Sequence, residues 1–141
     1  MLLLSHPGTV IAQHKLASIK GLRCSFTLKS TNTWTSAGEP EGKTAPSTLT
    51  LLFDEINSDD GTGQLRSGQM ASEVIVRQSG IYLHLMQSFR TGPLYTTTVF
   101  DNETAPGQLK AVHSRHEFFP TPLPGITSSP EQYLGSCEIV K

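Results

Sequence analysis

Charge, cysteine and long apolar runs are all scarce in this sequence. Only 16% of the 141 residues are Asp, Glu, Lys or Arg, and 11 basic against 12 acidic side chains give a net charge of −1. Such a balance excludes a general electrostatic attraction to nucleic acid or to anionic membranes. No apolar stretch approaches the roughly 20 residues that a membrane-spanning helix needs. We therefore expect neither a nucleic-acid partner nor a transmembrane span.

Helical periodicity is also nearly absent, apart from one expected turn at residues 14–19. From residue 22 onward, apolar and polar side chains alternate in short runs bounded by Gly, Pro, Asn and Asp. This period of two predicts strands. Seven or eight strands with short turns favour an all-β antiparallel meander that closes, or nearly closes, into a small barrel, with a β-sandwich as the alternative. The expected strands are residues 22–28, 48–56, 63–66, 72–77, 81–89, 94–100, 108–119 and 132–140.

Three segments are expected to be loops. Residues 36–47 hold two Pro, two Gly and two Glu, so we expect a long exposed loop that serves as a lid. Residues 101–107 form a second loop, and residues 120–130, with four prolines, cannot be the interior of a regular element. The strand at 81–89 is apolar or weakly polar on both faces, which predicts a central strand covered on both sides.

The length fits one ordinary domain, which we place at residues 21–141. Residues 1–20 have two interpretations. Val10, Ile11 and Ala12 are followed by Gln13, a pattern similar to the small-residue end of a secretory signal, so this segment would be the remnant of a signal peptide. Alternatively, it is an N-terminal tail with no role in export.

The two cysteines, Cys24 and Cys137, lie near opposite ends of the chain. Each falls in the apolar register of an expected strand, and we predict a disulfide between them. Since a disulfide needs Cα atoms within about 7 Å, the first and last strands would be neighbours, as in a closed sheet. Such a bond persists in oxidising compartments, which predicts a periplasmic or secreted protein. The alternative is a cytoplasmic protein with two buried free thiols.

Residues 110–117 are rich in side chains that ligate metals or transfer protons. His113 and His116 lie in this segment, and His84 could neighbour them across the sheet, so these three histidines are a candidate metal site. Residues three apart on a regular strand point to opposite faces, however, so only a bulge would align His113 with His116. The alternative is structural or solvent-facing histidines. We predict no cofactor.

Aromatic side chains are the candidate lining of a ligand cavity at the mouth of the barrel. Arg115, with Arg90 and Lys110, would anchor an anionic ligand there. The competing interpretation is core packing, because aromatic rings dominate small cores. The ligand-binding residues that we predict are Trp34, Tyr82, His84, Phe89, Tyr95 and Arg115, and the wider aromatic set adds Phe100, Phe118, Phe119 and Tyr133.

Three segments, residues 95–100, 110–116 and 132–138, resemble parts of small, uncharacterised bacterial exported proteins. The resemblance covers roughly residues 21–139. It implies an exported protein with cysteines in its first and last strands. It implies no particular activity.

These observations favour a binding or interaction module rather than an enzyme. The first hypothesis is a barrel that binds a small molecule. The second is a structural or accessory subunit of an envelope or membrane complex, which docks on a protein partner through residues 120–130 and exposed aromatic rings. The third is a metal-dependent enzyme centred on His84, His113 and His116.

Overall fold

The computed structural model describes residues 15–119 and 129–141. One short 3-10 helix, η1 (Lys15–Ser18), precedes eight strands. Within these residues no helix has the length and apolar character to cross a bilayer. The strands are β1 (Leu22–Trp34), β2 (Pro40–Asn57), β3 (Thr62–Ser67), β4 (Met70–Ser79), β5 (Tyr82–Ser88), β6 (Leu94–Ala105), β7 (Gln108–His116) and β8 (Glu131–Ile139).

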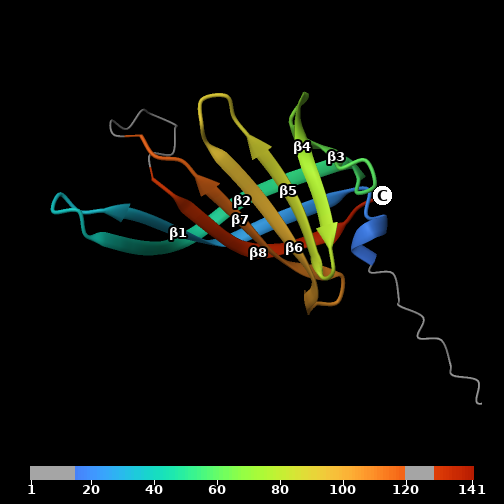
Figure 1. Cartoon of the computed structure of the whole chain (residues 1–141). Coiled ribbons are helices and arrows are strands. Elements are labelled where there is room, and N and C mark those ends of the chain that lie inside the picture. The colour runs from blue at the N-terminus through green and yellow to red at the C-terminus, as the bar shows by residue number, and fades with distance from the viewer. Residues whose placement is uncertain (1–14, 120–128) are drawn as a thin grey trace, which may run out of the picture.

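The eight strands form a closed antiparallel ring (Figure 1). Each strand pairs with the next one along the chain, and β1 pairs with β8 from Leu22 opposite Ile139 to Thr31 opposite Glu131. Closure leaves no free edge in the body of the ring, so its backbone groups find partners within the sheet. The predicted antiparallel meander with its first and last strands side by side is confirmed.

The interior of the ring is filled by the side chains that alternate inward along the strands. Phe26, Phe53 and Leu83 are all at most 2% exposed. At the end of the ring that holds the C-terminus, η1 lies across the opening (Figure 1), and its Leu16 is 0% exposed in the core. The described domain therefore includes residues 15–20, which we expected to belong to the tail. Residues 1–14, where the signal-peptide interpretation falls, lie outside the described residues.

Within the described residues the outer face of β5 is only partly covered, contrary to the expectation for residues 81–89. Leu83 and Leu85 point inward and are buried, whereas Tyr82 is 43% exposed. A closed ring has one enclosed face and one outer face, so a strand with apolar residues on both sides still buries only one of them.

Much of the expected loop at residues 36–47 is strand. β2 already begins at Pro40, and the turn after β1 is closed by the N–H of Thr35, which donates to the carbonyl oxygen of Glu39. The polar residues that follow are exposed, but their backbone pairs with the end of β1. The two strands thus form an arm that extends past the ring (Figure 1).

The arm tolerates two prolines because of their position in the ladder. β3 pairs with β2 only from Leu52 onward, so the other edge of β2 has no partner strand before that residue in the described chain. Since Thr35 and Glu39 form a hydrogen-bonded pair, alternation along β2 turns the nitrogens of Pro40 and Pro46 toward this edge. No ladder hydrogen bond is lost there.

The disulfide between Cys24 and Cys137 is present, as predicted. The two residues are direct partners in the β1–β8 register, with Cα atoms 4.0 Å apart, and both are 0% exposed. Nearby, a Cβ atom at Gly135 would overlap the carbonyl oxygen of Ser25. Glycine at this position therefore lets β8 approach β1 next to the bridge.

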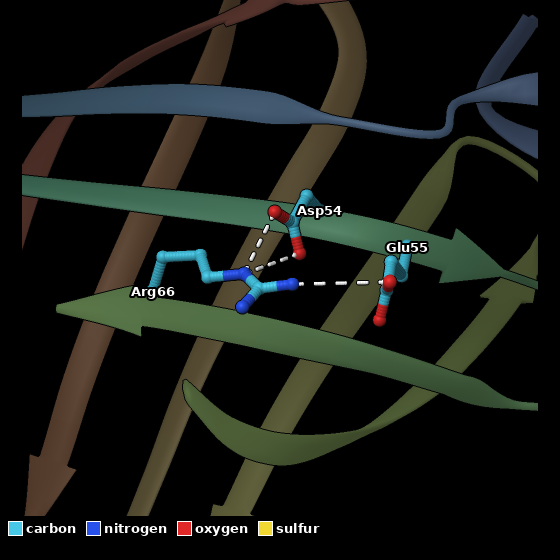
Figure 2. Close-up of polar contacts among 3 residues, drawn as sticks. All are labelled: Asp54, Glu55 and Arg66. Atoms are coloured by element: carbon cyan, nitrogen blue, oxygen red, sulfur yellow. Dashed lines mark hydrogen bonds and ion pairs between the residues drawn. The ribbon is translucent and has the colours of Figure 1, made fainter. Parts of the chain in front are cut away.

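A β-bulge in β2 directs the side chain of Ile56 into the core, in addition to that of Phe53. The β2–β3 register shifts between Asp54 and Asn57, and Glu55 there has a φ of 50°. This left-handed residue lets Ile56 join Phe53 inside the ring, although the two are three positions apart. Figure 2 shows Arg66 of β3 beside the bulge.

The guanidinium of Arg66 braces this bulge from outside the ring. Its Nε donates to both carboxylate oxygens of Asp54, at 3.0 and 2.8 Å, and its Nη2 lies 3.8 Å from Glu55 (Figure 2). The hydrogen bond to Asp54 raises the pKa of Arg66. Both partners are partly exposed, so the pair positions the two strands more than it stabilises them.

Removing the disulfide should destabilise the fold strongly. The bridge joins residues 113 positions apart, so it restricts the unfolded chain. We expect the double variant Cys24→Ala/Cys137→Ala to lose about 2 to 5 kcal/mol of unfolding free energy in urea titrations. An unchanged denaturation midpoint would show that β1 and β8 stay paired without the covalent link.

The left-handed backbone at Glu55 should carry a measurable strain. Gly adopts a φ of 50° freely, whereas Ala does not, and both remove the same carboxylate. We expect Glu55→Gly to be more stable than Glu55→Ala by about 1 kcal/mol in urea denaturation. Equal stability of the two variants would contradict the bulge geometry.

Candidate functional site

A pocket opens at the end of the ring where β7 and β8 part. Their last paired residues are Arg115 and Glu131. Beyond them the strands separate, and the backbone N–H of Asn32 on β1 donates to the carbonyl oxygen of Pro130 at 3.0 Å. The resulting cavity, which we call the mouth pocket, measures about 410 Å³ and is lined by Asn32, Ser114, Arg115, His116, Glu117, Phe118, Pro130, Glu131 and Gln132.

The inner face of the ring becomes polar toward this pocket. On β7, the inward positions change from buried Leu109 and Ala111 to His113 and Arg115, and Glu117 follows beyond the strand end. The neighbouring strands change in the same way, since Val99 gives way to Thr97 and Tyr95 on β6, and Cys137 to Tyr133 and Glu131 on β8. Strand pairing aligns these series, so their polar ends meet.

Arg115 lies at the centre of this polar end. Its guanidinium carbon is 5.0 Å from the ring centroid of Tyr95 and 5.3 Å from that of Tyr133. Its Nε donates a hydrogen bond to Nε2 of His113 at 3.2 Å. The cation is thus held between two aromatic rings, an arrangement that favours a positive charge.

His113 is buried and neutral. Because Nε2 accepts from Arg115, the proton lies on Nδ1, which is 2.8 Å from Oγ1 of Thr97 and donates to it. Burial, and secondarily the charge of Arg115, lowers the pKa of His113 to about 4. Both ring nitrogens are engaged, so neither is free to bind a metal or to relay a proton.

Two tyrosine–glutamate pairs flank the arginine. The hydroxyl of Tyr95 donates to Oε2 of Glu117 at 2.8 Å, and the hydroxyl of Tyr133 donates to Oε2 of Glu131. Burial, followed by these hydrogen bonds, raises the pKa of each tyrosine to about 12. Both phenols therefore stay protonated near neutral pH and act as hydrogen-bond donors.

One carboxylate oxygen at the pocket has no donor. Oε1 of Glu117 is buried and accepts no hydrogen bond from any residue that the structure describes. The Glu117 side chain is 8% exposed and lines the mouth pocket. A buried acceptor without a partner costs about 1 to 3 kcal/mol, so a donor brought to this oxygen would be favourable.

Only part of the predicted ligand-binding set gathers here. Tyr95 and Arg115 belong to the polar end of the ring, and Phe89 packs on Tyr95 with ring centroids 4.9 Å apart. Trp34 is on the arm and packs edge-on against Phe118, which lines the pocket. These four residues therefore lie in or beside one site.

Tyr82 and His84 do not reach the site, which corrects the prediction for both. They stack on each other on the outer face of β5, with ring centroids 5.9 Å apart. On β5, Leu83 and Leu85 point inward, so Tyr82 and His84, which alternate with them, must point outward. Lys110 also lies on the outer face, so it is not an anchor for a ligand at the mouth pocket.

The three histidines of the candidate metal site are not brought together. His113 points into the ring, His116 is exposed at the end of β7, and His84 faces outward, where its Nδ1 contacts Oγ1 of Thr98. Residues three apart on β7 face opposite ways because that strand has no bulge between them. Across residues 15–119 and 129–141, no group of three potential ligands could hold a metal ion.

Sequence reasoning missed the acidic members of the site. Glu117 and Glu131 were not among the predicted site residues. His113 was predicted as a metal ligand, with a structural histidine as the alternative, and its two ring contacts are those of a structural histidine. Period-two alternation from Leu109 would have placed His113, Arg115 and Glu117 on one face. The pairing of that face with Tyr95 and Glu131 depends on strand register, which a single sequence does not show.

Comparisons with known proteins add no relative. A scan against protein-family models finds no match to this chain, and searches of curated proteins and of solved structures find none either. The functional argument therefore rests on the mouth pocket and on the contacts within it.

His113 should make the fold sensitive to acid. Its pKa is about 4 in the folded protein and about 6.5 when unfolded, so the unfolded chain takes up the proton first as the pH falls. The stability that neutral His113 contributes is complete above pH 6.5 and is lost toward pH 4, by about 3 kcal/mol at most.

Urea denaturation of the wild-type protein and of His113→Gln at several pH values tests this. We expect a steeper loss of unfolding free energy in the wild type between pH 6.5 and 4. His116→Gln is the matched control, since His116 is exposed, and it should behave as the wild type. Parallel curves for wild type and His113→Gln would contradict a lowered pKa.

Proposed function

We propose that this protein is an exported binding module that holds a small molecule in the mouth pocket. The observation that carries the proposal is the convergence of Arg115, Glu117 and Glu131 on one open cavity between the ends of β7 and β8. Charged side chains are rarely gathered at one cavity unless they serve recognition or each other. In the described structure neither carboxylate forms an ion pair with Arg115.

The dimensions of the pocket support a small ligand. Sites for small molecules usually have volumes of about 300 to 1,000 Å³ and combine apolar walls with a few polar groups. The mouth pocket, at about 410 Å³, combines Phe118 and Pro130 with the polar groups at the end of the ring. The ring interior is filled, so the ligand would bind at the opening of the ring rather than deep inside it.

The state of the titratable groups favours binding over catalysis. The lowered pKa of His113 keeps it neutral, and the raised pKa values of Tyr95 and Tyr133 keep them protonated at neutral pH. A general acid or base works best when its pKa lies near the operating pH. These three groups are therefore suited to fixed hydrogen bonding rather than to proton transfer.

Export is supported by the disulfide. A bridge between Cys24 and Cys137 persists in an oxidising compartment, such as the periplasm or the extracellular space. The resemblance of three segments to exported bacterial proteins agrees with this location. We propose a periplasmic or secreted protein, with a cytoplasmic location as the alternative.

The second candidate function is docking, as an accessory subunit, on an apolar segment of a partner protein. It is favoured by a groove of about 480 Å³ on the outer face, whose lining includes Leu28, Phe100, Val112 and Leu134. Residues 120–128, which belong to the segment expected to dock, lie outside the described residues. Leu28 and Leu134 are 42% and 43% exposed. The groove shares no lining residue with the mouth pocket, so variants can separate the two functions.

Ligand binding can be tested on the disulfide-bonded protein with amide chemical shifts from NMR. The probes are benzylamine, benzoate and benzyl alcohol at millimolar concentration, which share one ring and differ in charge. We expect at least one probe to shift the amide signals of residues 114–118 and Gln132 saturably. The variant Ser114→Phe should abolish these shifts, because Ser114 lines the pocket and the larger ring would fill it.

The matched control is Ser25→Phe. Like Ser114, Ser25 lies on the outer face of the ring, but it pairs with Ser136 and Thr50, away from the mouth pocket. This variant should bind the probes as the wild type does. The proposal is wrong if no probe shifts these signals saturably, or if Ser114→Phe binds as well as Ser25→Phe.

A further inference from the structure

We infer that the ligand of the mouth pocket is a small organic cation whose protonated nitrogen carries N–H groups, such as a primary ammonium or an amidinium. The inference rests on the proposed binding function and adds the chemical class of the ligand. It differs from the expectation of an anionic ligand, which was based on Arg90, Lys110 and Arg115. The charges at the pocket, the hydrogen bonds of Arg115 and the orphaned oxygen of Glu117 lead to it.

The charged lining of the pocket has an excess of one negative charge. Glu117 and Glu131 contribute two carboxylates, and Arg115 contributes the single permanent cation. The two other basic residues of the anionic-ligand hypothesis are not among the lining residues, and Lys110 lines the groove on the outer face instead. The electrostatic balance of the site therefore favours a positively charged ligand.

Arg115 has only its Nη groups left to contact an anion. Tyr95 and Tyr133 lie against its guanidinium, and its Nε is occupied by His113. These contacts fix its plane and stabilise its charge without an anionic partner. An anion drawn to this guanidinium would also meet the carboxylates on either side of it, and their repulsion would offset the attraction.

Glu117 has a carboxylate oxygen that lacks a hydrogen-bond donor among the described residues. Its Oε2 is taken by the Tyr95 hydroxyl, whereas its buried Oε1 lacks a partner within the described chain. Because Oε1 is buried, the Glu117 side chain must turn toward the cavity before a ligand N–H can reach it. The contact would then be a charge-assisted hydrogen bond, which is the stronger kind. A quaternary ammonium has the charge but no N–H, so it would leave this oxygen unsatisfied.

The aromatic side chains suit the apolar part of such a ligand. Phe118 lines the pocket, and Trp34 packs against it from the arm with ring centroids 5.6 Å apart. Trp34 is 51% exposed and Phe118 is 55% exposed, so their faces are available for contact. An aromatic or aliphatic group attached to the nitrogen would cover these rings while the nitrogen reaches Glu117.

The experiment compares dissociation constants for benzylamine, benzyltrimethylammonium, benzyl alcohol and benzoate, measured from the same amide shifts on the disulfide-bonded protein. We expect benzylamine to bind most tightly. Glu117→Gln should weaken benzylamine by about tenfold or more and change benzyl alcohol little, since the amide still accepts a neutral hydrogen bond but lacks the charge. The comparison of probes on the wild-type protein does not depend on the variant.

The matched control is Glu138→Gln. Glu138 is at the other end of β8, where it pairs with Arg23 at 2.9 Å on the surface, so this variant should bind benzylamine as the wild type does. The inference is overturned if benzoate, benzyl alcohol or the quaternary ammonium binds as tightly as benzylamine, or if Glu117→Gln leaves benzylamine binding unchanged. Binding of benzoate alone would refute only the cationic class, whereas no binding by any probe would refute the proposed function as well.

Discussion

The pairing of β1 with β8 is the constraint on which the rest of the structure depends. It converts a linear succession of hairpins into a ring, and the buried bond between Cys24 and Cys137 lies within this seam. Without the seam, two long strand edges would be exposed, and the sheet would have no enclosed face. The absence of a side chain at Gly135 belongs to the same constraint, because the strands approach too closely for a Cβ atom there.

Closure of the ring also explains how hydrogen-bonded polar side chains can be held at its open end. One end of the ring is filled by apolar side chains and covered by η1, so His113 is held away from water and stays neutral. The other end opens where β7 and β8 separate, and there Arg115 and Glu117 reach the surface of a pocket. Along the inner face of the ring, the side chains change from apolar to polar toward the open end. The buried hydrogen bonds of His113 therefore lie next to the mouth pocket.

Local pattern accounts for much of the fold, and its failures have identifiable causes. Alternation predicted the strands, although β1 continues beyond its expected end and β6 continues to Ala105 through residues expected to form a loop. Residues 36–47 were expected to be a loop because they are polar, but pairing with β1 satisfies their backbone whether or not their side chains are buried. The apolar outer face of β5 was expected to be covered, yet a ring encloses only one face. Both errors come from inferring tertiary surroundings from side-chain polarity.

The sequence alone determined the all-β class and the approximate strands, because these follow from period-two alternation. With only two thiols, it also limited any disulfide within the chain to Cys24 and Cys137, but the register between β1 and β8 decided that they meet. Tertiary structure alone decided which side chains share the mouth pocket. Tyr95, Arg115 and Glu131 come from three strands, and the register between those strands brings them together. It also decided that Tyr82 and His84 face away from the pocket, because closure of the ring decides which alternate residues of each strand point into the interior.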